Sequence, residues 1–104
     1  MLVCLVTAAS LEEAHRIARA LVEERLAACV NVLPGVRSVY RWEGTVEEAE
    51  EILLVVKTVP ERFDAMRDRV LSLHSYQVPE VVALPVHAAA SAYERWVQES
   101  VAAG

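Results

Sequence analysis

The 104-residue sequence is poor in the residues that build phosphate-binding loops and cross-linked frameworks. With three glycines, it contains neither a glycine-rich phosphate-binding pattern nor the G-x-S-x-G motif of serine hydrolases. Its two cysteines, Cys4 and Cys29, are too few for a disulfide framework and lie in apolar runs, so we interpret them as reduced. These absences argue against nucleotide hydrolysis, serine hydrolysis and a disulfide-rich fold, and we expect no enzyme activity.

Positive charge and long apolar runs are also scarce. Ten basic residues, of which Lys57 is the only lysine, face fifteen acidic ones, so the formal net charge is −5. This balance argues against nucleic acid or an anionic membrane as a partner. No apolar run reaches the 18 residues typical of a membrane span, and the run Met1–Val6 lacks the basic residues that begin a signal peptide. We therefore expect a cytoplasmic protein.

Apolar residues, in contrast, are abundant. They make up 55% of a chain whose length, residues 1–104, suits a single domain. The usual share is roughly 45–50%, and a small domain buries only part of its apolar surface. The surplus therefore predicts an interface between subunits.

Hydrophobic periodicity predicts four strands and three helices. Alternating or continuous apolar positions favour strands at residues 2–6, 28–42, 47–57 and 81–86. Apolar residues at helical spacing favour helices beginning near residues 10, 60 and 91. Two S-x-x-E sequences predict capping boxes, Ser10 with Glu13 and Ser91 with Glu94. The order β-α-β-β-α-β predicts an α+β, ferredoxin-like sandwich with an extra C-terminal helix.

The second predicted strand is too long for a domain of this size. Residues 28–42 would span roughly 45–50 Å if straight, whereas a 100-residue globule is only about 35 Å across. Pro34 and Gly35 predict a bulge within it. The apolar part beyond the bulge would aggregate unless it paired with another subunit. We therefore expect an intersubunit arm, with aromatic interface residues at Tyr40, Trp42 and Trp96.

Five motifs, in order along nearly the whole chain, resemble the CutA family of divalent-cation tolerance proteins. They are RLAACVN at 25–31, SVYRWEG at 38–44, EILLVVKT at 51–58, HSYQVPE at 74–80 and YERW at 93–96. The resemblance implies a single CutA-like domain and a homotrimer similar to the PII signalling proteins. It also implies a role in tolerance of copper or another divalent metal ion.

Candidate metal ligands are few and are not spaced as in closed metal centres. Copper binds thiolate and imidazole groups, and we assign weak binding to Cys29, His74 and Glu80. Of the other candidates, we interpret Cys4 as buried, His15 as solvated and His87 as a loop residue. Some family members carry further soft ligands at the positions of Val6 and Leu73, so the resemblance also implies weak binding here.

The segment from His74 to Glu80 has two interpretations. His74, Tyr76 and Glu80 lie where a helix passes into a strand, so they could coordinate a metal or hold the counter-groups of a small anion. Alternatively, the segment is a structural turn in which His74 caps helix carbonyls and Pro79 directs the chain into the strand.

The likeness to PII proteins adds a candidate ligand cleft between subunits. We assign to it Lys57, which could meet a phosphate or carboxylate, together with Tyr76 and Trp42. The alternative for Lys57 is an ion pair with Glu51 or Glu80 of another subunit. Three hypotheses follow: a trimeric metal-tolerance protein, a PII-like sensor of a small ligand, and a trimeric scaffold that anchors another protein.

Overall fold

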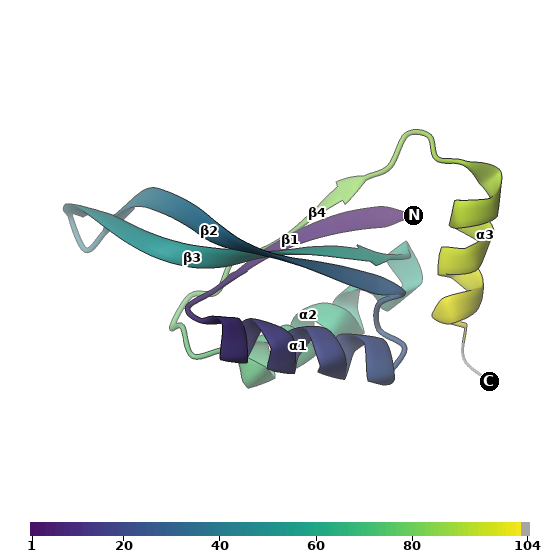
Figure 1. The fold of residues 1–104 in the computed structure, drawn as a ribbon, viewed down its shortest axis with the longest axis horizontal. Helices are drawn as coiled ribbons and strands as arrows, with labels where there is room; N and C mark the ends of the chain where they lie inside the picture. The colour runs from purple at the N-terminus through teal and green to yellow at the C-terminus, as the bar shows by residue number, and fades with distance from the viewer. Residues whose placement is uncertain (103–104) are drawn as a thin grey trace.

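A computed structural model describes residues 1–102 and confirms the predicted α+β fold (Figure 1). The sheet is antiparallel, with strand order β2-β3-β1-β4. Helices α1 and α2 lie side by side beneath one face of this sheet, as in ferredoxin-like proteins. In chain order, the elements are β1 (Leu2–Ala8), α1 (Leu11–Glu23), β2 (Cys29–Trp42), β3 (Thr45–Thr58), a 3₁₀ turn (Pro60–Arg62), α2 (Phe63–Leu73), β4 (Val81–Pro85) and α3 (Ser91–Ser100).

The hydrophobic core lies between the two central strands and the two helices. Alternate side chains of β1 and β3 point to the helices, and the apolar faces of α1 and α2 cover them. The fully buried members include Cys4, Val6, Leu54, Val56, Ile17, Leu21, Met66 and Val70. Helix α3 packs apart from this core, where Val97 and Val101 contact Ala28, Met1 and Val59.

The opposite face of the sheet is also apolar and only partly covered. Val82 pairs with Leu5, and Leu84 pairs with Val3, so these four side chains share one face. Val82 and Leu84 are both exposed. This open face is apolar surface of the kind that the sequence analysis assigned to an interface between subunits, which stays a prediction.

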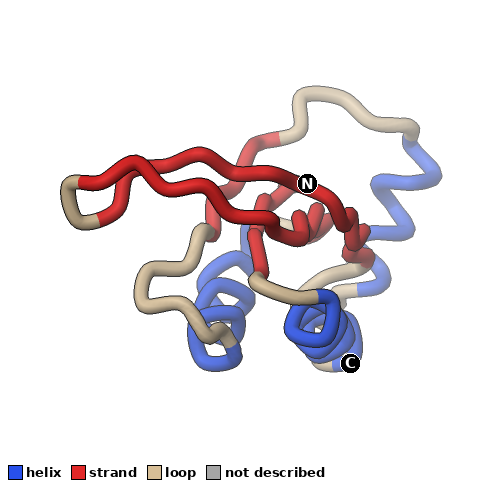
Figure 2. Tube along the Cα trace, turned by 60° about the vertical axis from the view of Figure 1, so that its left-hand side comes forward, coloured by secondary structure: helices blue, strands red, loops and turns tan. Residues whose placement is uncertain are grey.

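The β2–β3 ribbon projects beyond the core, as Figure 2 shows. Leu33 pairs with Leu53 and Val36 with Glu51, so Pro34 and Gly35 together oppose one residue. Gly35 has a φ of +80°, and the predicted bulge is confirmed. The molecule measures 44 × 26 × 21 Å, and Val39 in the ribbon is 64% exposed.

One predicted cap is confirmed and the other is wrong. The Ser10 hydroxyl accepts a hydrogen bond from the Glu13 backbone N–H (3.2 Å), as predicted. The cap at Ser91 does not form, because α3 begins at Ser91 itself and Ala90, which has no capping side chain, holds the N-cap position. Among residues 1–102, no helix is long and apolar enough to cross a membrane.

Candidate functional site

A cavity of about 530 Å³ lies between the β2–β3 ribbon and the segment that follows α2. Tyr40, Trp42 and Glu51 line it from the ribbon. Tyr76, Val78 and Glu80 line it from the segment 74–80. The structure thus brings together four residues that the sequence analysis singled out: Tyr40, Trp42, Tyr76 and Glu80.

The bulge in β2 places Tyr40 and Trp42 on the same face of the ribbon as Glu51. The partner of Glu51 across the ribbon is Val36, and alternation along β2 then puts Tyr40 and Trp42 on the same face as Glu51. Glu50, the preceding residue, points to the opposite face, where it pairs with Arg37. Glu47, which pairs with Tyr40, shares this face, but Glu51 is the glutamate of β3 that lines the cavity.

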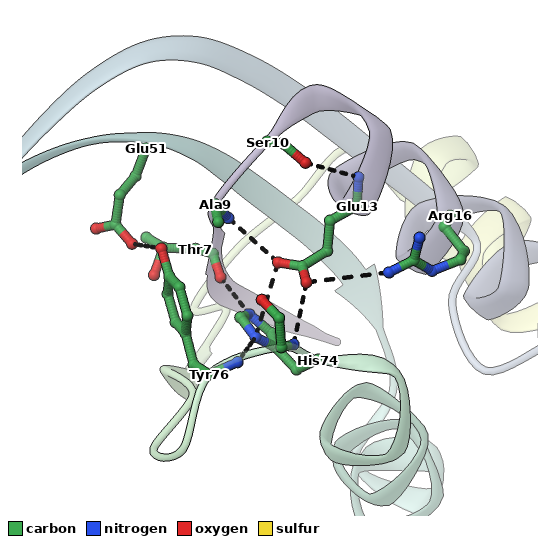
Figure 3. A network of polar contacts seen from close by, with 9 residues as sticks. Thr7, Ala9, Ser10, Glu13, Arg16, Glu51, His74 and Tyr76 are labelled. Carbon is green, nitrogen blue, oxygen red and sulfur yellow. Dashed lines mark hydrogen bonds and ion pairs between the residues drawn. The ribbon is translucent and has the colours of Figure 1, made fainter.

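The Glu51 carboxylate is bound by a phenol. The Tyr76 hydroxyl donates a hydrogen bond of 2.6 Å to Oε2 of Glu51, which is only 7% exposed (Figure 3). Burial, followed by the hydrogen bond to Glu51 and its charge, raises the pKa of Tyr76. Tyr76 is therefore protonated at neutral pH and acts as a donor.

His74 attaches the segment 74–80 to the end of β1. Its Nδ1 accepts a hydrogen bond from the Tyr76 backbone N–H (3.1 Å), so the ring proton is on Nε2, which donates to the Thr7 carbonyl at 2.6 Å. The ring also packs on the Tyr76 ring, with centroids 4.6 Å apart. The imidazole therefore positions Tyr76. His74 is also the C-cap residue of α2, as the structural interpretation predicted, but its backbone N–H and not its ring donates to the Val70 carbonyl.

Glu13 holds the same segment from the start of α1. Its carboxylate accepts the backbone N–H groups of Ala9 (3.2 Å) and Ser75 (3.0 Å), as Figure 3 shows. Burial alone would raise the pKa of Glu13, but the hydrogen bonds from Ser75 and Ala9 and the nearby His74 hold it below its usual value. Glu13 is therefore an ionised clamp between α1 and the cavity wall.

The three predicted metal ligands do not form a cluster. Cys29 pairs with Lys57, which pairs with Val3, whereas His74 bonds to Thr7, about 13 Å further along β1. Both ring nitrogens of His74 are engaged, so a metal could bind there only by displacing one of these bonds. Within residues 1–102, no three histidine, cysteine, aspartate or glutamate side chains group as a metal site would require.

Lys57 lies away from this cavity within one chain, and its place in a cleft between subunits stays a prediction. Its ammonium group contacts the Asn31 side chain across the ribbon. Lys57 lies six positions after Glu51 along β3, which corresponds to about 20 Å. An ion pair of Lys57 with a glutamate of another subunit stays a prediction.

The two cysteines differ in their solvent accessibility. Cys4 is fully buried in the core, and burial raises its pKa to about 11, so it is unsuited to bind metal. Cys29 is half-buried near Tyr93, whose pKa is raised first by burial and then by Cys29. Trp96 packs on Tyr93 with ring centroids 5.6 Å apart and is exposed, and its role at an interface stays a prediction.

Sequence reasoning missed the roles of Glu13 and Glu51. Glu13 was assigned only to a helix cap, and Glu51 to an alternative ion pair with Lys57 of another subunit. The available signal for Glu51 was its position at the end of the acidic run, directly before Ile52 and the apolar part of β3. His15 and His87 are exposed, in agreement with their interpretation as solvated and loop residues.

Comparison with known families identifies the chain. Residues 2–100 match the family described as "CutA1 divalent ion tolerance protein". The chain belongs to this family. The "Divalent-cation tolerance protein CutA" of Thermus thermophilus is 52% identical over 94% of this chain and 95% of its own length. Human "Protein CutA" is 46% identical over 90% of this chain, which spans 52% of the human protein.

Solved structures of the family share the fold closely. The divalent cation tolerance protein of Thermus thermophilus gives a TM-score of 0.95 at 50% identity, covering 98% of this chain and all of that one. The protein from Archaeoglobus fulgidus gives 0.94 at 43% identity, covering 98% and 100%. Its title calls it periplasmic, and an Arabidopsis thaliana relative is named chloroplastic. Relatives thus occupy different compartments, and the cytoplasm stays a prediction for this chain.

Proposed function

We propose that this chain contributes to divalent-cation tolerance as a homotrimer that binds copper or another divalent metal ion weakly. The observation that carries the proposal is the dispersal of its candidate ligands. Cys29 offers a half-buried thiol at one end of the sheet, and Glu80 a carboxylate at the other. Isolated ligands of this kind favour weak binding over the tight binding of a closed four-ligand centre.

The homotrimer is supported by apolar surface in two places. Val82 and Leu84 are exposed on the open face of the sheet, and Val39 and Val46 are exposed on the ribbon. An exposed apolar ribbon with an unpaired edge strand aggregates unless a partner covers it. A closed ring of three chains protects every ribbon in the same way.

Copper titration tests the metal part of the proposal. We expect Cys29→Ser to lower the affinity for Cu(I) at least tenfold and Glu80→Gln to lower that for Cu(II), because thiolate and carboxylate prefer ions of different softness. His15→Gln, on the exposed side of α1, is the matched control and should leave both affinities unchanged. Unchanged copper binding in both Cys29→Ser and Glu80→Gln would refute the assigned sites.

Substitution of a ribbon aromatic tests the trimer. Trp42→Asp places a charge in the proposed contact, which should cost about 3–5 kcal/mol if the site is buried between subunits. Light scattering should then report a smaller assembly than for the wild type. Leu71→Asp, at an exposed apolar residue of α2, should keep the wild-type mass. If Trp42→Asp also keeps it, Trp42 is not an interface anchor.

A second candidate function is a PII-like sensor with a small-ligand cleft. The cavity between Trp42 and Tyr76 favours it, because its volume of about 530 Å³ suits a small molecule. A ligand that binds the native state raises the melting temperature, so a thermal-shift screen of metabolites tests this function. The scaffold hypothesis stays a prediction.

A further inference from the structure

We propose that the cavity between the β2–β3 ribbon and the segment 74–80 binds a small organic cation, such as an amine or guanidinium compound. This inference rests on the proposed ligand cleft and adds its ligand class. Two carboxylates, Glu51 and Glu80, line the cavity together with the rings of Tyr40, Trp42 and Tyr76. Among the described residues that line it, none is a lysine, arginine or histidine.

The buried charge of Glu51 is the first argument. Glu51 is only 7% exposed, and its carboxylate accepts a hydrogen bond from the neutral Tyr76 hydroxyl. Within residues 1–102, no basic nitrogen lies within 4.0 Å of it. A buried carboxylate is costly unless a positive charge accompanies it. A cation in the cavity would supply that charge.

The aromatic walls indicate an organic cation in preference to a metal ion. Trp42 and Tyr40, which we also expect to contact a neighbouring subunit, are partly exposed in the single chain where they line the cavity. Aromatic faces attract ammonium and guanidinium groups, whereas Ca²⁺ requires six to eight oxygen ligands and Mg²⁺ an octahedron of them. One oxygen of Glu51 already accepts the Tyr76 hydroxyl, and within residues 1–102 no three histidine, cysteine, aspartate or glutamate side chains gather as metal ligands.

The same lining disfavours an anionic ligand. Glu51 and Glu80 would repel a phosphate or carboxylate, and Lys57, the residue predicted to meet such a group, lies away from the cavity in the same chain. The sequence-based option of a small anion at this segment therefore has less support than a cation.

Calorimetric titration of the assembled wild-type protein tests the inference. The probes are agmatine, putrescine and tetramethylammonium, compared at equal ionic strength with neutral 1,4-butanediol, anionic glutarate and MgCl₂. We expect saturable binding of at least one organic cation, at least tenfold tighter than that of butanediol, glutarate or Mg²⁺. Absence of saturable binding by every organic cation, or equal binding of butanediol, would overturn it.

A matched pair of substitutions locates the site. Glu51→Gln preserves size and can still accept the Tyr76 hydroxyl, and it should weaken cation binding at least tenfold. Glu50→Gln, on the opposite face of the same strand, should change the affinity less than twofold. Equal effects of the two substitutions, in variants with the wild-type mass and melting temperature, would contradict the assignment to this cavity.

A fluorescence titration tests the location of the bound cation without any substitution of Glu51. In Trp96→Phe, Trp42 is the only tryptophan, and agmatine should change its emission saturably while butanediol should not. If the Trp42 emission does not change at agmatine concentrations that saturate the calorimetric signal, the cation binds elsewhere and the proposed site is refuted. If the same protein still binds copper through Cys29, the metal-tolerance proposal stands even when the cation inference fails. The failure of the inference can therefore be told apart from the failure of the proposed function.

Discussion

The packed half of the sheet and the projecting ribbon share strand β3 but are stabilised differently. Leu54 is fully buried under α1, whereas Val46, eight residues earlier in the same strand, is 59% exposed. Both positions carry apolar, strand-favouring side chains. The comparison shows that strand propensity forms both halves, while only one half obtains its hydrophobic burial from its own chain.

The candidate site lies at the boundary between these halves. Glu51 is buried, and Glu50 beside it is exposed. The clamp formed by Glu13 and His74 belongs to the packed half, whereas Tyr40 and Trp42 belong to the ribbon. Substitutions in either half should therefore affect the cavity, but they should lower the free energy of unfolding by different amounts.

The largest effect is expected in the packed half. Leu54→Ala removes a fully buried side chain and should lower the free energy of unfolding by about 2–5 kcal/mol, because a cavity remains. Urea denaturation at fixed protein concentration measures it. The control Val22→Ala, at an exposed residue of α1, should stay within about 0.5 kcal/mol of the wild type. A similarly small loss for Leu54→Ala would mean that this half is not the stabilising core.

A smaller loss is expected at the clamp between the halves. Glu13→Gln removes a charged acceptor of the Ala9 and Ser75 N–H groups and should cost about 1–3 kcal/mol at neutral pH. Urea denaturation measures this loss. Glu12→Gln, in the same turn but exposed, is the control.

The pH dependence of the clamp has a defined sign. The folded-state pKa of Glu13 is lowered, so the unfolded chain takes up the proton first as the pH falls. The stabilising contribution of Glu13 is complete above the ordinary glutamate pKa of about 4.3 and is lost as the pH falls through the folded value. The wild type should thus lose more stability in acid than Glu13→Gln. Parallel pH profiles of the two proteins would contradict this account.

A still smaller effect is expected at the bulge that starts the ribbon. Gly35→Ala should cost about 1–2 kcal/mol, because the backbone there has a φ of +80°. An added methyl group meets no atom within 4 Å, so the cost is conformational and not a clash. Gly44→Ala, at φ +81° in the ribbon turn, should cost a similar amount without disturbing the Glu51 register. Stabilisation by Gly35→Ala in urea denaturation would disprove the strained geometry.

The least perturbing comparison uses thiol labelling. The half-buried Cys29 should react with a thiol reagent in the native protein, whereas Cys4 should react only after unfolding, since its pKa is about 11 and it is fully buried. We expect one reactive thiol per native chain and two in denaturant. Cys29→Ser should abolish the native reaction, and labelling of Cys4 in that variant would contradict the burial of β1.

The elements of the fold could be predicted because their signals are local. Apolar spacing gave the strands and helices, and Pro34–Gly35 gave the bulge. The two S-x-x-E sequences show the limit of such signals. Ser10 lies directly before its helix and caps it, whereas the helix at Ser91 begins one residue too early for the same bond.

The candidate site was only partly predictable because its contacts join distant parts of the chain. Tyr76 and Glu80 were identified from their segment, but the partner of Tyr76 is Glu51, 25 residues away. Glu13 binds Ser75 across 62 residues. Such pairs follow from strand register and helix packing, which no local spacing encodes.

The central claim is that sister chains cover the ribbon and the open face of the sheet, and the solution mass of the unmodified protein tests it most directly. Multi-angle light scattering at micromolar concentration should give three times the chain mass of 11.5 kDa. A single species of 11.5 kDa would contradict the account.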